Sequence, residues 1–182
     1  MQHDSTGRSP ASENPGMNRV QTFARVRPPL PREIKPEGFT RCLGVPPGAE
    51  SKRLLVATTD QPVLLDSRGC IAGSPPAGLK SFALDKCFQE HSTTADVYDG
   101  SCKPLVENVR SHGRNATFLC YGMTGSGKTH TMMGTPTEPG LIAQAVHDLL
   151  TGGKGAVSLS FLQIYGKELT DLLSTDEVRL AI

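Results

Sequence analysis

The residues best suited to chemistry in this sequence form a glycine-rich loop in the second half of the chain. The loop matches the pattern G-x-x-x-x-G-K-[ST] and consists of Gly122, Met123, Thr124, Gly125, Ser126, Gly127, Lys128 and Thr129. Glycines let the backbone come close to a ligand, so that successive N–H groups can surround the phosphates of a nucleoside triphosphate. In this scheme Lys128 reaches the β- and γ-phosphates, and the Thr129 hydroxyl ligates Mg²⁺. The alternative is a chance match in a surface loop, so the flanking elements must decide.

The segments on both sides of the loop favour the phosphate-binding interpretation. Ala116–Tyr121 is a short apolar, β-rich run that predicts a buried strand ending at the loop. Lys128–Met133 contains no glycine or proline and predicts the opening turns of a helix. A phosphate-binding loop requires this order of strand, loop and helix, whereas a surface loop does not. The sequence therefore predicts a nucleotide site, with Lys128 as the residue that acts on the transferred phosphate.

Composition places the chain among domains of moderate size. With 182 residues, of which 37% are hydrophobic, it can form one domain with a real core. Its net charge of +1 gives no argument for a nucleic-acid or anionic-membrane surface. No apolar stretch is long enough to span a membrane, and the polar start lacks the core of a secretory signal. The 5 scattered cysteines fit neither a zinc site nor a disulfide framework. We expect an intracellular, soluble protein without membrane or nucleic-acid contacts.

The chain divides into a leader and one folded region. Residues 1–17 are rich in Ser, Pro, Asn and Gly and are expected to be disordered, and the folded domain covers 18–182. A first strand is predicted near Val20–Val26. Prolines and glycines break up the region that follows, which reads as a peripheral hairpin lobe with short strands at Leu54–Thr58 and Val63–Leu65. A longer strand is predicted over Lys80–Phe88.

Helical periodicity dominates the second half. A helix is predicted from about Thr93 to Ser111, with Thr93 and Asp96 as a capping box and Pro104 as a local break. Residues 134–140 hold two prolines and two glycines, so they form a loop that interrupts a helix before it resumes at Leu141. A strand is predicted over 157–165, and 168–173 is helical or extended.

Several segments, in this order, resemble the N-terminal half of a kinesin motor domain. The resemblance covers about residues 19–182, and the glycine loop lies within the specific motif Y-G-x-T-G-S-G-K-T-H-T-M. The matching segments are Arg25-Val26-Arg27-Pro28, Phe82-Ala83-Leu84-Asp85 with Phe88, Val97-Tyr98, Lys103-Pro104-Leu105-Val106, Tyr121 to Met132, Leu162 to Tyr165 and Asp171-Leu172-Leu173. Tyr98–Ser101 and the spacing of Met133–Gly140 lean toward the chromosome-associated, Kid-like group.

The resemblance implies a fold and further site residues. The fold is that of an α/β P-loop NTPase, a motor head with a central mixed sheet flanked by helices, incomplete in this chain. By resemblance, Arg25 and Pro28 flank the adenine of ATP, Arg27 lies nearby, and His130 borders the base. A guanidinium stacks on an aromatic plane and a proline ring covers the other face, which suits this role. The alternative is a solvated basic turn and, for His130, an ordinary position on a helix surface.

The family's two nucleotide switches do not occur in these 182 residues. Neither N-x-x-S-S-R-S-H nor a D-x-x-G-x-E after the loop is present. Phosphoryl transfer needs a positioned water and charge stabilisation at the γ-phosphate, to which both switches contribute. We therefore expect a chain that is inactive alone, and strands whose neighbours in the sheet are absent would leave unpaired edges.

Two function classes remain. In the first, the chain is the ATP-binding portion of a microtubule-based motor, with ATP and Mg²⁺ as cofactors, microtubules and ATP or ADP as partners, and a cytoplasmic, cytoskeletal location that extends to the spindle. In the second, it is a truncated nucleotide-binding or interaction fragment that never cycles. Another P-loop enzyme, such as a small kinase or GTPase, lacks its own markers, since no N-K-x-D motif is present.

Overall fold

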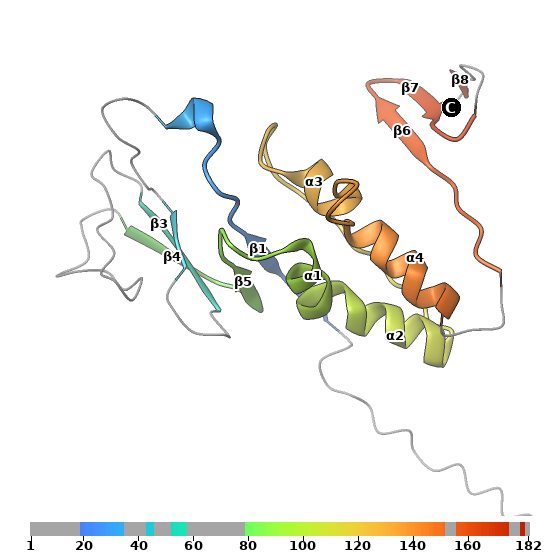
Figure 1. The fold of residues 1–182 in the computed structure, drawn as a ribbon, viewed down its shortest axis with the longest axis horizontal. Coiled ribbons are helices and arrows are strands. Elements are labelled where there is room, and N and C mark those ends of the chain that lie inside the picture. The colour runs from blue at the N-terminus through green and yellow to red at the C-terminus, as the bar shows by residue number, and fades with distance from the viewer. Residues whose placement is uncertain are drawn as a thin grey trace, which may run out of the picture.

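The computed structural model describes residues 19–34, 43–45, 52–57, 79–151, 156–174 and 179–180. Two sequence predictions, the disordered leader at 1–17 and the strand at Val63–Leu65, lie outside these residues. Within them, strands form three small sheets joined by a helical region, as Figure 1 shows. No helix in this described part of the chain is long and apolar enough to cross a membrane.

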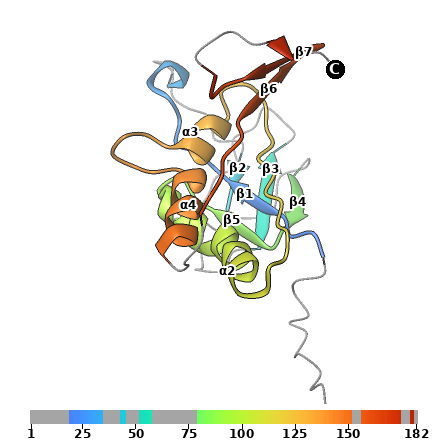
Figure 2. The same ribbon diagram turned by 90° about the vertical axis from the view of Figure 1, so that its right-hand side faces the viewer.

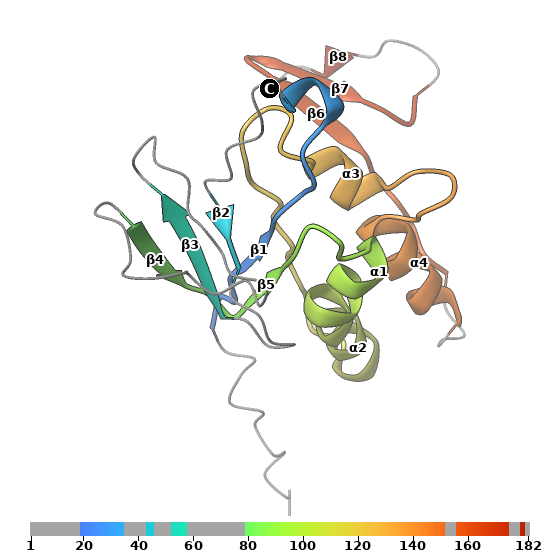
Figure 3. The same ribbon diagram turned by 60° about the vertical axis from the view of Figure 1, so that its left-hand side comes forward.

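Two of the sheets lie on one side of the helices. β1 (Phe23–Arg25) and β5 (Lys86–Phe88) form a parallel pair in which Ala24 faces Cys87. Next to them is an antiparallel sheet in the order β2-β3-β4. Its strands are β2 (Leu43–Gly44), β3 (Arg53–Ala57) and β4 (Leu79–Ala83). Figure 3 shows this sheet at the edge of the molecule, so the prediction of a peripheral hairpin lobe is confirmed for its described strands.

The predicted strand Lys80–Phe88 is in fact two strands in two different sheets, so that prediction was wrong at its centre. Between β4 and β5, the backbone N–H of Asp85 donates to the carbonyl of Thr22 at 2.8 Å. The Asp85 carboxylate accepts from the Thr22 N–H at 2.7 Å and forms an ion pair with Arg19. The hydrogen bond from Arg19 is the main reason why the pKa of Asp85 is lowered to about 2. These contacts to residues before β1 fix Asp85 at the point where the chain leaves the sheet of β4 and enters the sheet of β5.

The first helical run begins with the predicted cap and contains the predicted break. The Thr93 hydroxyl accepts from the N–H of Asp96 at 3.1 Å, and the Asp96 carboxylate accepts from the N–H of Thr93 at 2.8 Å. The run continues through α1 (Thr94–Val97), a π-helical turn at Tyr98–Cys102 and α2 (Lys103–His112). Pro104 lies in the first turn of α2, where its missing N–H is tolerated.

The prediction of an interrupted helix is also confirmed. α3 (Lys128–Met133) and α4 (Leu141–Thr151) are separated by a closed turn, in which Thr135 N donates to Glu138 O at 2.9 Å. Gly134 and Gly140 approach each other so closely that a Cβ on Gly134 would lie 2.2 Å from the Gly140 nitrogen. Only glycine fits such an approach, which explains the composition of this turn.

The core lies where the β1–β5 pair meets the helices. Its buried residues come from β5, the first helical run and the start of α4, and they are Phe88, Val97, Tyr98, Cys102, Val106 and Leu141. Phe23, Phe118, Met132, Ala145 and Leu149 pack against them while partly exposed. The Tyr98 hydroxyl donates to Asp148 on α4 at 2.8 Å, which joins the two helical segments beside the core.

Two strand predictions were not met. Ala116–Tyr121 is extended but belongs to no strand, and Leu119 and Tyr121 are 84% and 94% exposed. It is therefore not the buried strand that the sequence predicted; Figure 3 draws it as a plain coil leading from α2 toward α3. Of the strand predicted over 157–165, only β6 (Leu162–Tyr165) forms. Neither 116–121 nor 157–161 belongs to a sheet among the described strands, although the N–H of Leu172 donates to the carbonyl of Phe161 at 2.8 Å.

β6 belongs to the third sheet, at one end of the molecule. It pairs antiparallel with β7 (Glu168–Asp171), which pairs with β8 (Arg179–Leu180). Of the two options for 168–173, the extended one is therefore found. Figures 1 and 2 show this sheet reached through the extended segment 156–161. Ile164 and Tyr165 are 70% and 79% exposed, so this sheet buries little of its apolar surface.

Candidate nucleotide site

The glycine-rich loop has the coiled backbone that phosphate binding requires. Gly125 and Gly127 adopt φ values of 81° and 97°, in the left-handed region that side chains disfavour. The N–H of Ser126 donates to the carbonyl of Met123 at 3.1 Å, which closes the loop on itself. A Cβ on Gly122 would lie 2.5 Å from the Ser126 hydroxyl oxygen, so glycine is also needed there for space. The pattern of glycines thus reflects local geometry.

The ammonium group of Lys128 is hydrogen-bonded to the backbone of this loop. Its Nζ donates to the carbonyl of Gly122 at 2.9 Å and to that of Met123 at 3.0 Å. Lys128 is also the first residue of α3. In the first turn of this helix, the N–H of Thr131 donates to the carbonyl of Gly127 at 2.9 Å. The earlier N–H groups of a helix have no acceptor within it. A positive side chain beside such donors fits the binding of an anionic phosphate.

Arg27 links the loop to the segment after β1. Its Nε donates to the carbonyl of Gly125 at 2.9 Å. Its other nitrogens contact Glu33, in the short 3₁₀ helix Pro31–Glu33, with Nη1 to Oε2 at 2.7 Å and Nη2 to Oε1 at 2.5 Å. The hydrogen bond from Arg27 is the main cause that lowers the pKa of Glu33 to about 2. Arg27 therefore lies near the loop, as expected, and contacts its backbone directly.

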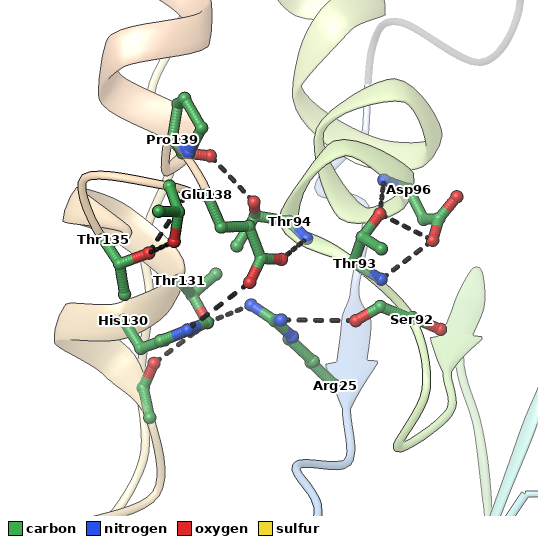
Figure 4. A network of polar contacts seen from close by, with 12 residues as sticks. Arg25, Ser92, Thr93, Thr94, Asp96, His130, Thr131, Thr135, Glu138 and Pro139 are labelled. Carbon is green, nitrogen blue, oxygen red and sulfur yellow. Dashed lines mark hydrogen bonds and ion pairs between the residues drawn. The ribbon is translucent and has the colours of Figure 1, made fainter.

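Arg25 connects β1 to the elements on either side of the site. Figure 4 shows its guanidinium between α3 and the residues that precede α1. Nη1 donates to the Thr131 hydroxyl at 3.0 Å, and Nη2 donates to the carbonyl of Ser92 at 3.3 Å. The Thr131 hydroxyl in turn donates to the carbonyl of Gly127 at 2.9 Å. A chain of hydrogen bonds thus runs from β1 to the end of the glycine loop.

A second set of contacts in Figure 4 centres on Glu138, in the turn between α3 and α4. Its Oε1 accepts from the N–H of Thr94 at 2.7 Å, and its Oε2 lies 3.8 Å from Nε2 of His130. The hydrogen bond from Thr94 is the main cause that lowers the pKa of Glu138. The buried hydroxyl of Thr94 donates to the carbonyl of Pro139 at 2.8 Å. Glu138 therefore ties the turn both to α1 and to a predicted base-contacting residue.

One cavity of about 1340 Å³ collects most of the predicted site residues. Its lining includes Arg25, Arg27, Pro28, Gly122, Gly125, Ser126, Gly127, Lys128 and His130. Met123, Thr124 and Thr129 lie on the same loop and the first turn of α3, but they are not among the lining residues. Residues far apart in the sequence, around 25–28 and 122–130, thus share one cavity.

Sequence reasoning missed Thr131, which lines this cavity, and Thr94, Glu33 and Glu138, whose hydrogen bonds hold the surrounding elements. Thr94 and Thr131 are buried polar residues, and Glu33 and Glu138 accept hydrogen bonds that hold site elements together. The Arg27–Glu33 pair had a local signal in the sequence, because the Glu33 carboxylate follows Arg27 by six residues. The partner of Glu138 is 44 residues away in the sequence, so no local pattern could have indicated that contact.

The comparison with known families decides what kind of site this is. A family model described as the kinesin motor domain matches residues 68–182. The chain belongs to the kinesin motor domain family. Kinesins are microtubule motors, and their motor domains bind a nucleotide and Mg²⁺.

Individual relatives agree with this assignment. The chain is 34% identical over 165 residues to kinesin-like protein KIN-8A of Oryza sativa, a match that covers 86% of the chain and 20% of that relative. It is 41% identical over 102 residues to kinesin-like protein KIF22 of Rattus norvegicus, covering 50% of the chain and 15% of the relative. KIF22 is among the relatives, in line with the lean toward the Kid-like group.

A solved structure gives the same result for the fold. The chain resembles a protein described as a fast kinesin with a TM-score of 0.65 and 26% identity, over 87% of this chain and 42% of that one. The expected class, an α/β P-loop NTPase of the motor-head type that is incomplete in this chain, is therefore confirmed. The chain spans about a fifth of the length of rice KIN-8A.

Proposed function

We propose that these 182 residues are the ATP-binding portion of a microtubule-based motor, and that they bind ATP or ADP with Mg²⁺. One observation carries the proposal: Arg25, Pro28 and His130 line the same cavity as the glycine loop and Lys128. A base at one end and phosphates at the other would contact both sets of residues together. Microtubules as the partner, and the cytoskeleton or spindle as the location, are part of the proposal on the ground of family membership.

The contacts of Lys128 and Arg27 support their roles, whereas the role of Thr129 rests on the loop pattern alone. Lys128 would release its carbonyl partners, Gly122 and Met123, and bind the β- and γ-phosphates, which are stronger partners for an ammonium ion. Thr129 would supply a hydroxyl ligand to Mg²⁺, which neutralises phosphate charge when bound. Arg27, already bonded to the loop backbone and to Glu33, would hold the loop in shape.

In the part of the cavity proposed to hold the adenine, the contacts of Arg25 favour a role in stacking on the base. Its two terminal nitrogens already bond Thr131 and Ser92, so its guanidinium is held in one orientation. Such a fixed planar group can stack on a purine at a low cost in side-chain entropy. Pro28 would cover the base from the same segment, and His130 would border it from α3.

The experiment is a titration of the 182-residue chain with a fluorescent ATP analogue in the presence of Mg²⁺. Lys128→Ala is expected to weaken binding by at least tenfold, because charge-assisted bonds to two phosphates are lost. Lys167→Ala, in the exposed turn between β6 and β7, is the matched control and should bind as the wild type does. Equal affinities of the wild type and the Lys128→Ala variant would refute the proposed site.

A second candidate is a fragment that binds nucleotide without turnover. Two observations favour it: segment Ala116–Tyr121 pairs with no strand among the described residues, and neither switch motif occurs in the 182 residues. Binding can be measured by the titration above, whereas turnover requires phosphate release with and without microtubules. Stimulated release by the 182 residues would support a complete motor function and exclude this second candidate.

A further inference from the structure

Thr131 is a buried polar residue in the wall of the proposed nucleotide site. It belongs to α3, is only 8% exposed and lines the cavity. It follows the last residue of the glycine loop, Thr129, by two positions, so the loop pattern assigns it no role. A buried hydroxyl group that lacks hydrogen-bond partners lowers stability. The partners of the Thr131 hydroxyl are therefore the place to look for its role.

The direction of the Thr131 hydroxyl is set by the last glycine of the loop. Its single proton is donated to the carbonyl of Gly127 at 2.9 Å. A Thr side chain in a helix often donates in this way to the carbonyl four residues before it. The lone pairs of the hydroxyl oxygen are then left as acceptors. One of them accepts from Nη1 of Arg25 at 3.0 Å, and Figure 4 shows the two groups facing each other.

The bond to Thr131 is the shorter of two that orient the Arg25 guanidinium. The other runs from Nη2 to the carbonyl of Ser92 at 3.3 Å, which is longer than the usual limit of about 3.2 Å. Both have a charged donor, which strengthens a bond of good geometry. Without the Thr131 hydroxyl, the guanidinium would keep only the longer bond, and its long side chain would regain rotational freedom.

We infer that Thr131 is a positioning residue, which holds the Arg25 guanidinium in the orientation that stacks on the adenine. This role rests on the proposed function, in which Arg25 contacts the base. A guanidinium stacks through its flat face, so bonds made in its plane leave that face available. The Gly127 carbonyl that orients Thr131 belongs to the glycine loop. The loop that binds the phosphates therefore also sets where the base is held.

The experiment compares a ligand that has a base with one that has none. Thr131→Val keeps the branched shape of the side chain and removes the hydroxyl, while the backbone N–H can still bond Gly127. Calorimetric titration with Mg·ADP should show binding that is about fivefold weaker or more, because the charge-assisted bond to Arg25 is lost. Inorganic tripolyphosphate with Mg²⁺ should bind within about twofold of the wild type, since it contacts only the loop. An equal loss for both ligands, or no loss for Mg·ADP, would overturn the inference.

Two further variants test whether Thr131 acts through Arg25. Thr131→Ser keeps a hydroxyl that can bond both partners, and it should retain most of the affinity for Mg·ADP. In an Arg25→Ala background the partner is already absent, so adding Thr131→Val should weaken Mg·ADP binding by less than about twofold. Effects of the two substitutions that simply multiply would refute the positioning role. So would a Thr131→Ser variant that binds Mg·ADP as weakly as Thr131→Val.

The wild type separates failure of this role from failure of the proposed function. If the wild-type chain binds Mg·ADP no more tightly than Lys128→Ala does, the proposed nucleotide site is wrong, and the role of Thr131 is refuted with it. If the wild type binds more tightly than Lys128→Ala, but Thr131→Val binds as the wild type does, only the positioning role is wrong. Binding by the wild type with a selective loss of Mg·ADP in Thr131→Val supports both.

Discussion

The helical region and the extended segments of this molecule differ in how far their backbone groups are hydrogen-bonded and their apolar side chains are buried. In the two helical runs, Thr94–His112 and Lys128–Thr151, the caps and turns are closed by residues of the described chain, and the helices pack around Phe88, Tyr98 and Leu141. Segment 116–121 and the β6–β7 hairpin instead expose large apolar side chains. Helices satisfy their backbone groups within themselves, whereas strands need neighbours. In the described residues, the elements whose partners are local in sequence are thus satisfied, whereas these extended segments stay exposed.

The largest expected effect tests this contrast directly. Phe88→Ala removes a side chain that is 3% exposed, and should lower the free energy of unfolding by about 3–5 kcal/mol. Ile164→Ala, at a residue that is 70% exposed in β6, should change it by less than about 0.5 kcal/mol. Urea unfolding of the two variants measures both. Similar losses would show that the β6–β7 hairpin is packed as tightly as the helical region.

A smaller effect is expected at the turn between α3 and α4. Glu138→Ala removes the acceptor of the Thr94 N–H. Because Thr94 is only 1% exposed, its N–H is left without this partner, and the change should cost about 1 kcal/mol in unfolding free energy. Glu138→Gln keeps an oxygen acceptor and should cost less than half as much. The same urea titration distinguishes them. An equal loss in both variants would mean that the charge toward His130, and not the bond to Thr94, stabilises this turn.

The smallest expected effect is a pH dependence at Glu33. Its pKa in the folded chain is about 2, below the usual value of 4.5. As the pH falls below about 4.5, the unfolded chain therefore takes up a proton before the folded chain does. The stabilisation from the Arg27–Glu33 pair is full above pH 4.5 and is lost as the pH falls toward 2. Between pH 5 and 3, the melting temperature of the wild type should fall more steeply than that of Glu33→Gln. Parallel curves would contradict this.

The local signals in the sequence predicted local structure well. The Thr93–Asp96 cap, the break before Pro104 and the interruption between Met133 and Leu141 were all readable, because the residues that cause them lie within a few positions of one another. The glycine loop was readable for the same reason. Its assignment as a nucleotide site stays a prediction until binding is measured.

The failures share a different physical cause. Lys80–Phe88 alternates like one strand, but the contacts of Asp85 to Arg19 and Thr22, more than sixty residues away, divide it. Ala116–Tyr121 has the composition of a buried strand, yet burial depends on neighbours that the described chain does not provide. Composition reports what a segment prefers, and pairing depends on what lies beside it.

The bridge made by Arg27 has a consequence for how the glycine loop responds to a ligand. One guanidinium holds the carbonyl of Gly125 and the carboxylate of Glu33 at the same time, so the loop and the 3₁₀ helix at Pro31–Glu33 are thermodynamically linked. A ligand that binds better when this bridge is intact must strengthen the bridge by the same factor. The surface helix is thus a reporter of the loop: its exchange with solvent should slow whenever the loop is held in place.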